Sequence, residues 1–278
     1  MLSLVPTPIG NLDDLGFRAA ERLTKAEIFF CEDTRVTKKL LRLLGDRRGV
    51  RFRPDARFIS LHSHNEKSVL ESVDRALFDR ACVYVSDAGM PCVSDPGALL
   101  IDYAIKNKIE YEVLPGANAA LTAFAASGSA SGEKYIFYGF LPHKAEARRS
   151  ELTALLRYPF AIALYESPRR IAAFAALIAE LAPDRRIAAF KEMTKLHEKR
   201  YIGAAIGFAK ALETMSAKGE WTIILAPNKT PLSARNEALI DEVKNLKAPI
   251  KPLSKILAKL SGETSGAWYE RLRQNANA

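Results

Sequence analysis

The residues best placed to bind a ligand lie in VYVSDAGMPCVSDPG, residues 83–97. An apolar strand pattern there runs into a loop with two aspartates, two glycines and two prolines, and a helical pattern, ALLIDYAIK, follows. Open α/β sheets bind ligands in such loops, where a strand gives way to a helix. The spaced glycines of a dinucleotide site and the Gly-Lys-Ser/Thr ending of a phosphate loop are both missing. The pattern therefore predicts a ligand site that uses neither of these motifs.

The two aspartates of this loop have different expected roles. Asp95 precedes Pro96, Gly97 and an apolar helix, which is the arrangement of a helix N-cap followed by proline at the first helical position. We therefore expect Asp95 to cap that helix. Asp87 follows the strand closely and has no obvious helix to cap, so it is the stronger candidate for a ligand contact.

His62 and His64 in LHSHNE stand two residues apart and could form one arm of a metal site. No third ligand accompanies them at a metal-binding spacing. Cys31, Cys82 and Cys92 likewise form neither a metal motif nor a disulfide framework. We therefore expect no metal, and the cysteine pattern is typical of a protein of the reducing cytoplasm.

Polar clusters also follow the neighbouring predicted strands. VPTPIGN, CEDTR, LHSHNE, SDAGMPCVSDPG and LPGANAA come at the ends of apolar runs at 2–5, 27–31, 57–61, 82–86 and 111–115. Helical patterns lie between these runs. Such an alternation predicts a mostly parallel sheet with helices on both faces. The polar clusters then stand at strand ends, where sheets of this kind bind ligands.

A second series of strands and helices begins after Pro115 and Gly116. Beyond Pro227 the chain is helical without a strand pattern, and two short helices joined by a glycine-containing turn there have the outline of a helix-turn-helix. We therefore predict an α/β protein with two α/β domains, at 1–116 and 117–228, and a basic helical accessory segment at 229–278. The second series places strands at 135–140, 160–165, 186–190, 199–203 and 221–225, with helices around 144–157, 168–181 and 204–216.

Composition favours a soluble, folded, cytoplasmic protein. Hydrophobic residues make up 48% of the chain, which supports a sizeable core and argues against disorder. The N-terminus lacks the charged start and apolar run of a signal peptide, and no stretch approaches the roughly 18 apolar residues of a membrane span. The net charge, 41 − 32 = +9, is compatible with a polyanionic partner.

Two segments are strongly basic. Residues 35–53 hold eight Lys or Arg and a single acid, Asp46, and residues 229–278 hold nine Lys or Arg against five acids. Clusters of this kind neutralise the phosphates of nucleic acids. A solvated helix face is the simpler interpretation of each cluster, although it is weaker for residues 35–53, where one sign dominates.

Nine sequence blocks resemble those of a known family, in the same order. They are VPTPIGNLDD, CEDTR, LHSHNE, VSDAGMPCVSDPG, LPGANAA, YGFLPHK, LYESPRRI, KEMTK and KGEWTIIL. The order is similar to that of the ribosomal RNA small subunit methyltransferase I family, which belongs to the tetrapyrrole-methylase-like enzymes that use S-adenosylmethionine (SAM). The resemblance runs from Leu2 to about Ala226.

This resemblance implies SAM in a cleft between two α/β domains, a homodimer, and methylation of a cytidine ribose 2′-hydroxyl in small-subunit (16S) ribosomal RNA, within the assembled 30S subunit. SAM has a positive sulfonium and no phosphate, so the missing phosphate motifs are compatible with it. Met90 stands where the family often has Thr, and PGANAA where it often has PGPCAA or PGPSA. Carried over to matching positions, the resemblance implies cofactor contacts at Asp87, Gly89, Met90, Pro91, Val93, Asn118, Ala119, Tyr165, Met193, Trp221 and Thr222.

Methyl transfer to a hydroxyl requires the enzyme to align oxygen, carbon and sulfur, and a base can remove the hydroxyl proton. The matching blocks offer four candidate bases, among which the sequence does not choose: Asp33, His64, Glu166 and Glu192. Each could instead make a structural hydrogen bond or ion pair. Arg35 beside Asp33 illustrates that alternative.

RNA binding is expected at basic residues of two segments. Tyr138 and Phe140 could also stack a splayed base, although burial in a strand is the simpler expectation for both. The basic residues are Arg35, Lys38, Lys39, Arg42, Arg47, Arg48, Arg51, Arg53, Lys144, Arg148 and Arg149.

Two other functions remain open at this point. Precorrin methylases share the implied fold and bind acidic tetrapyrroles, but the CEDTR and LHSHNE blocks and the basic helical tail favour RNA. A non-catalytic RNA-binding factor with a degenerate cleft is the other alternative. The intact SDAG and LPG blocks count against it.

Overall fold

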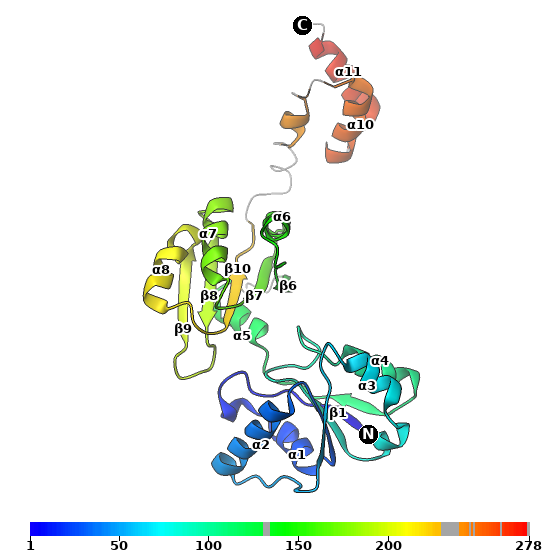
Figure 1. Ribbon diagram of the computed structural model, residues 1–278. Coiled ribbons are helices and arrows are strands. Elements are labelled where there is room, and N and C mark those ends of the chain that lie inside the picture. The colour runs from blue at the N-terminus through cyan, green and yellow to red at the C-terminus, as the bar shows by residue number, and fades with distance from the viewer. Residues whose placement is uncertain (130–133, 229–238, 245, 247, 262, 277–278) are drawn as a thin grey trace.

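The computed structural model describes residues 1–129, 134–228, 239–244, 246, 248–261 and 263–276. Two five-stranded sheets follow one another along the chain, and a pair of packed helices lies near the C-terminus, apart from both sheets (Figure 1). The predicted α/β class with a helical C-terminal segment is therefore confirmed.

The first sheet is parallel throughout, as the alternating pattern predicts. Its strands are β1 (Leu2–Leu4), β2 (Ile28–Cys31), β3 (Arg57–Ser60), β4 (Cys82–Val85) and β5 (Tyr111–Val113), in the spatial order β3-β2-β4-β1-β5. The strands β1, β2 and β4 are completely buried. Burial on both faces explains why they read as continuous apolar runs rather than as alternating patterns.

Helices cover both faces of this sheet. They are α1 (Phe17–Lys25), α2 (Thr34–Arg48), α3 (Glu66–Ser72) and α4 (Ala98–Lys106), with short 3₁₀ turns at Leu12–Asp14 and Arg75–Asp79. One apolar cluster joins α1 and α2 to one face of the sheet, and another joins α3 and α4 to the opposite face.

The expected N-cap of α4 is wrong. Gly97 occupies the cap position with φ +118°, and its lack of a side chain leaves the first backbone amides without a local partner. The buried carboxylate of Glu66 on α3 fills that role, since its Oε1 accepts from the backbone N–H groups of Gly97 and Leu100, each at 3.1 Å. Asp95 is thereby released from capping.

The second sheet is mixed. Its strands are β6 (Tyr135–Phe140), β7 (Ala161–Glu166), β8 (Arg186–Lys191), β9 (Lys199–Ala204) and β10 (Trp221–Leu225), in the order β6-β7-β10-β8-β9. Only β6 and β7 pair in parallel. The alanine-rich helix α5 (Ala119–Ala126) packs on one face. The opposite face is covered by α6 (Ala145–Leu155), α7 (Ile171–Leu181) and α8 (Phe208–Met215).

The C-terminal helices have a small core of their own. A helical segment at 239–244, α10 (Ile250–Ser261) and α11 (Ser265–Ala276) bury Ile240, Leu253, Leu257, Trp268 and Leu272 against one another. The pattern ARNEALIDEVKNL, residues 234–246, predicts one amphipathic helix, of which residues 234–238 and 245 lie outside the described part of the chain. No described helix has the length and apolar character needed to cross a membrane. The domain limits 1–116, 117–228 and 229–278 remain our proposal.

Candidate active site

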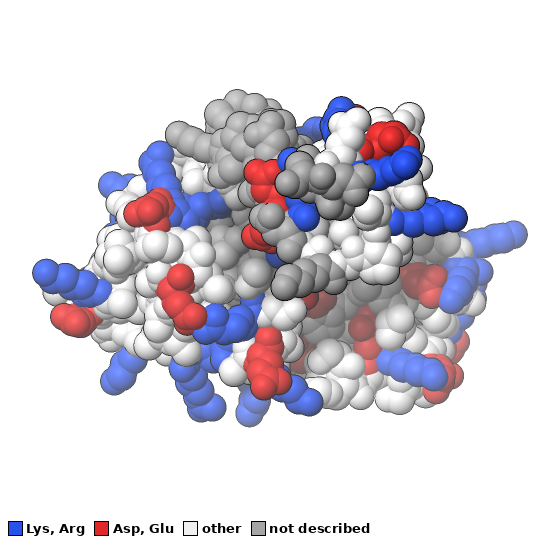
Figure 2. All heavy atoms as spheres, turned by 90° about the horizontal axis from the view of Figure 1, so that it is seen from above, with Lys and Arg blue, Asp and Glu red and all other residues white. Residues whose placement is uncertain are grey.

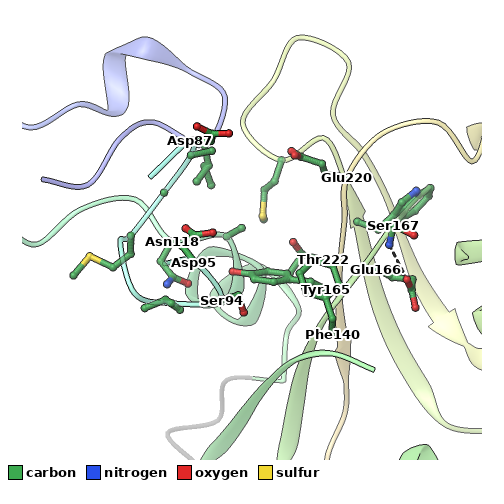
Figure 3. A pocket seen from close by; sticks show the side chains of 18 of the residues that line it. Asp87, Ser94, Asp95, Asn118, Phe140, Tyr165, Glu166, Ser167, Glu220 and Thr222 are labelled. Atoms are coloured by element: carbon green, nitrogen blue, oxygen red, sulfur yellow. Dashed lines mark hydrogen bonds between the residues drawn. The ribbon is translucent and has the colours of Figure 1, made fainter. Parts of the chain in front are cut away.

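A cavity of about 340 Å³ lies between the two sheets (Figure 3). The first domain contributes the loop after β4, residues 87–95, together with Glu32 and Ile9. The second contributes the start of α5, the ends of β6 and β7, Met193 and the start of β10. This volume is at the lower end of the range of small-molecule sites.

The structure brings nearly all of the expected cofactor residues together at this cavity. Of that set, Pro91 is buried beside the cavity and does not line it. The lining residues that were expected are Asp87, Gly89, Met90, Val93, Asn118, Ala119, Tyr165, Met193, Trp221 and Thr222.

The loop after β4 is tied to the loop after β1 through Gly89. The backbone N–H of Thr7 donates to the carbonyl of Gly89 at 2.9 Å, and that of Gly89 donates back to the carbonyl of Thr7 at 3.1 Å. Gly89 has φ +87°, and a Cβ there would lie 3.1 Å from Cγ2 of Ile9. Glycine is therefore needed for the backbone to pass this close to the cavity wall.

The wall of the cavity formed by the first domain is acidic. Glu32, Asp87 and Asp95 line it, and none of them takes part in an ion pair within the described chain. The backbone N–H of Asp87 donates to Oε2 of Glu32 at 3.1 Å. Burial and the Glu32 carboxylate raise the pKa of Asp87 above its ordinary value. This wall suits a ligand with positive charge.

A second contact between the domains closes the cavity near Met193. The backbone N–H of Asn11 donates to Oγ1 of Thr194 at 3.2 Å. At Gly10, a Cβ would lie within 3.0 Å of Met193, Thr194 and Lys195 atoms. The PIGN loop of the first domain and the KEMTK loop of the second therefore touch closely.

Similarity to known proteins agrees with this geometry. Residues 1–205 match the family model of the tetrapyrrole (corrin/porphyrin) methylases. Proteins named ribosomal RNA small subunit methyltransferase I are 39% identical in Campylobacter fetus, over 98% of this chain and 99% of that protein, and 41% identical in Helicobacter pylori strain 26695, over 82% and 84%. The chain belongs to this methyltransferase family.

Solved structures share the fold at low sequence identity. Diphthine synthase superposes with a TM-score of 0.61 at 13% identity, over 81% of this chain and 89% of that chain. A uroporphyrin-III C-methyltransferase from Thermus thermophilus, complexed with S-adenosyl homocysteine, has a TM-score of 0.53 at 15% identity, over 80% and 96%. The tetrapyrrole methylase fold is therefore shown.

SAM is the methyl donor of the family, and the cavity fits it. The close backbone at Gly89 leaves room for a ligand against the main chain. Glu32 and Asp87 of the acidic wall match the positive sulfonium and ammonium groups of SAM. One carboxylate oxygen of Glu166, Oε2, is buried without a hydrogen-bond partner at the opposite wall.

Of the four candidate bases, only Glu166 lines the cavity. Its side chain is 1% exposed, and Oε1 forms an ion pair with Nε of Arg170 at 2.7 Å. Oε1 also accepts from the backbone N–H of Ser167 at 2.7 Å. Glu166 therefore makes the structural ion pair and hydrogen bond that the sequence analysis gave as the alternative to a role as base.

The other three candidates lie outside the cavity lining. Asp33 caps α2 by accepting from the backbone N–H of Arg35 at 2.8 Å, and Nη2 of Arg35 pairs with it at 2.6 Å. These bonds lower the pKa of Asp33 to about 2. His64 is exposed in its loop. Oε1 of Glu192 accepts from the backbone N–H of Glu220 at 2.7 Å.

Sequence reasoning missed several lining residues. Glu32 stands beside Asp33 in CEDTR. Both residues follow the same predicted strand, so the pattern indicated a ligand contact for either of them. Ser94 and Asp95 belong to the loop that the sequence singled out, but Asp95 was assigned to a helix cap. The lining residues that the sequence did not single out as site residues are Ile9, Glu32, Ala88, Ser94, Asp95, Ser167, Pro168 and Glu220.

Acids from neighbouring segments neutralise part of the basic cluster at 35–53. Arg47 pairs with Asp13 at 2.5 Å, and Arg48 reaches the same carboxylate at 3.6 Å. Arg53 pairs with Asp55 at 2.7 Å. Figure 2 shows that on the face seen from above, basic side chains are spread among acidic ones rather than gathered into one block.

The other members of the basic set differ in exposure and pairing. Lys38 lies over the ring of Phe58, 4.9 Å from its centroid. In the second segment, Arg149 pairs with Glu180, and Arg148 is half-buried. No ion pair is found within the described residues for Lys39, Arg42, Arg51 or Lys144, which are all exposed.

Proposed function

We propose that the protein transfers a methyl group from SAM to the 2′-hydroxyl of a cytidine ribose in small-subunit ribosomal RNA. Family membership makes the chain a SAM-dependent methyltransferase. The observation that carries the finer proposal is a single cavity whose acidic wall suits a sulfonium and whose opposite edge presents an exposed aromatic ring.

The expected cofactor residues are proposed to hold SAM. Bound there, SAM supplies an activated methyl group. Asp87 and Glu32 would stabilise its positive charge, and the backbone around Gly89 would lie against it. Asn118 caps α5 by accepting from the backbone N–H of Leu121 at 3.0 Å, which fixes its place at the cavity.

The aromatic edge fits a nucleobase. Phe140 ends β6, lines the cavity and is 52% exposed, contrary to the burial that its strand position suggested. Its ring centroid lies 5.6 Å from that of Tyr165. The hydroxyl of Tyr165 accepts from the backbone N–H of Ala120 at 3.3 Å, which anchors the pair. Enzymes that modify nucleotides stack the splayed base on such rings.

The basic surface is proposed to bind the RNA phosphates. Exposed cations on α2 and near the start of α6 supply this charge, and the segment 229–278 is proposed as an accessory on the RNA side. The assembled 30S subunit as substrate, the homodimer and a cytoplasmic location belong to the same proposal. The names of the relatives support small-subunit RNA as the substrate, and the other three proposals rest on the resemblance of the loops alone.

The proposal is tested by incubating the purified protein with methyl-labelled SAM and 30S subunits, naked small-subunit RNA or a precorrin. We expect label in RNA, mapped by mass spectrometry to one cytidine 2′-oxygen. Gly89→Val is the matched control, since its side chain meets Ile9 and it should lose SAM binding while remaining folded. Label in the precorrin, or on an RNA base, would contradict the proposal.

A further inference from the structure

The loop that carries Asp95 has an unusual backbone. Cys92 and Ser94 adopt φ values of +67° and +64°, a conformation that residues with a side chain rarely take, and Gly97 follows at +118°. The backbone N–H of Cys92 donates to the carbonyl of Pro96 at 3.2 Å, which folds the loop back on itself. Such strain is maintained where the surroundings hold it, and it is concentrated at functional sites.

The second domain holds this loop at a bulge in β6. The pairing of β6 with β7 shifts register between Phe137 and Gly139, and Gly139 has φ +79°. A Cβ at Gly139 would lie 3.0 Å from Oγ of Ser94. The absent side chain therefore lets the loop reach the strand one residue before Phe140, so that Asp95 lies near the aromatic edge (Figure 3).

Asp95, Tyr165 and Glu32 line the same cavity. Burial raises the pKa of Tyr165, and the Asp95 charge adds to that rise. In the same way, Asp95 and Glu32 both add to the raised pKa of Tyr84, which is due first to burial. Asp95 therefore faces both the aromatic edge and the acidic wall.

The groups around Asp95 come from several elements, and the charged ones are acids. Burial raises its pKa to about 7, and the carboxylates of Glu32 after β2 and Asp87 after β4 add to the rise, while the hydroxyl of Ser86 opposes it. Tyr84 on β4 is influenced by the Asp95 charge as well. Among the described residues, no cation forms an ion pair with Asp95.

We propose that Asp95 is the base of the methyl transfer, a role that rests on the proposed function. Its carboxylate accepts the proton of the ribose 2′-hydroxyl while the oxygen forms its bond to the methyl carbon, and the electron pair of the broken sulfur–carbon bond stays on sulfur. The proton then passes from Asp95 to solvent. A base is most effective when its pKa lies close to the working pH. Burial and the neighbouring carboxylates bring the pKa of Asp95 close to neutral pH.

The four candidates from the sequence are less suited to this step. Asp33, with a pKa of about 2, is a weak base and points to Arg35. Glu166 is ion-paired, and Glu192 is bonded to the start of β10 and to Lys195. His64 lies in another loop, outside the lining. Asp95 combines a place in the cavity with a carboxylate that has no cationic partner within the described structure.

The test compares Asp95→Asn with the wild-type protein on 30S subunits. Asparagine keeps the shape of the side chain but cannot accept the proton. We expect the single-turnover rate to fall by roughly 10²- to 10⁴-fold. As the pH is raised toward 7, the wild-type rate should increase tenfold per pH unit, and above about pH 7 it should stay constant. This change of slope in the pH–rate profile should be missing in the variant. SAM affinity, measured by calorimetry, should change less than about threefold.

Two further variants sharpen the result. Glu32→Gln removes a charge that raises the pKa of Asp95, so the break in the pH–rate profile should move to lower pH. Asp102→Asn is the matched control, because Asp102 is exposed on α4 and pairs with Lys106 at 2.5 Å. Its rate and its profile should equal those of the wild type.

Each contrary outcome has a distinct meaning. A rate of Asp95→Asn within threefold of the wild-type rate, or an unchanged pH–rate break, would overturn the role of Asp95 and leave the proposed function standing. Loss of SAM affinity in that variant would make Asp95 a cofactor ligand and overturn its role as base. A wild-type protein that methylates no ribose 2′-oxygen would overturn the proposed function, and this role with it.

Discussion

Asp95 also has a consequence for stability that does not depend on catalysis. Its pKa is about 7 in the folded chain, above the roughly 3.9 of an unfolded aspartate. The folded state thus binds more protons between these two values, and stability decreases as the pH rises through that interval. The destabilisation is complete above about pH 7 and absent below about pH 4.

We therefore predict that Asp95→Asn stabilises the protein in a pH-dependent way. The melting temperature should rise by roughly 3–6 °C more at pH 8.5 than at pH 5.5, because asparagine stays neutral at both. Differential scanning calorimetry without SAM measures this. Asp102→Asn serves as the control, with an equal and small effect at both pH values. An equal rise of the melting temperature for Asp95→Asn at both pH values would contradict the raised pKa of Asp95.

The sequence indicated the loops of the site better than the role of each residue. Asp87 and Gly89 were found because strand, glycine and helix are adjacent in the chain. Asp95 was assigned to a cap because its local motif fits one. Glu66, about 30 residues earlier, outcompeted it by reaching across from α3. A cap supplied by a distant carboxylate leaves no trace in a local pattern.

The helix α2 presents two kinds of arginine and lysine. Arg47 and Arg48 share Asp13, whose loop precedes α1. Within the described chain, Lys39 and Arg42 are exposed and form no ion pair. The charge pattern predicted the same role for all four residues, because a charge count within 35–53 cannot include acids that folding brings in from elsewhere.

We predict that the double variant Lys39→Ala with Arg42→Ala binds 30S subunits more weakly than Arg47→Ala. Two lost phosphate contacts should lower the slope of log affinity against log salt by about 1–2. Arg47→Ala breaks an exposed ion pair worth about 0–1 kcal/mol, so its effect on RNA affinity should be small. Filter binding across a salt series measures both. Equal affinities would show that α2 is only a solvated face.

The positions of the strands were easier to predict than their pairing. Apolar runs indicated all ten strands found among the described residues, within two residues of their observed ends. The parallel first sheet followed from alternating strands and helices. The strand order of the second sheet did not follow from that alternation, because β10 inserts between β7 and β8. Strand insertion depends on packing between segments far apart in the chain.

The whole molecule consists of two sheets that share a cavity and a helical segment with a separate core. We predict that truncation after Asn228 leaves a folded protein that binds SAM, because α10 and α11 contribute no residue to the cavity. Its affinity for 30S subunits should fall about tenfold or more, in keeping with the loss of several cations. Calorimetry and filter binding measure the two effects.

A full-length variant separates charge from packing in this segment. Lys251, Lys255 and Lys259 are exposed on α10, while Leu253 and Leu257 are buried. Ile256 on the same helix is 46% exposed and lies outside that core. Alanine at the three lysines should reproduce the loss of RNA affinity. An insoluble or monomeric truncated protein would instead make the segment structural.

The position of β1 has a consequence for synthesis of the chain. Leu2 pairs with Cys82 on one side and with Tyr111 on the other. At 5–20 residues per second, β1 waits about 4–20 s for its neighbours. During that time its apolar side chains stay exposed because the strand has no partner strand. The first sheet is therefore completed only when β5, about 110 residues after β1, has been translated, and nascent-chain chaperones have that interval in which to bind β1.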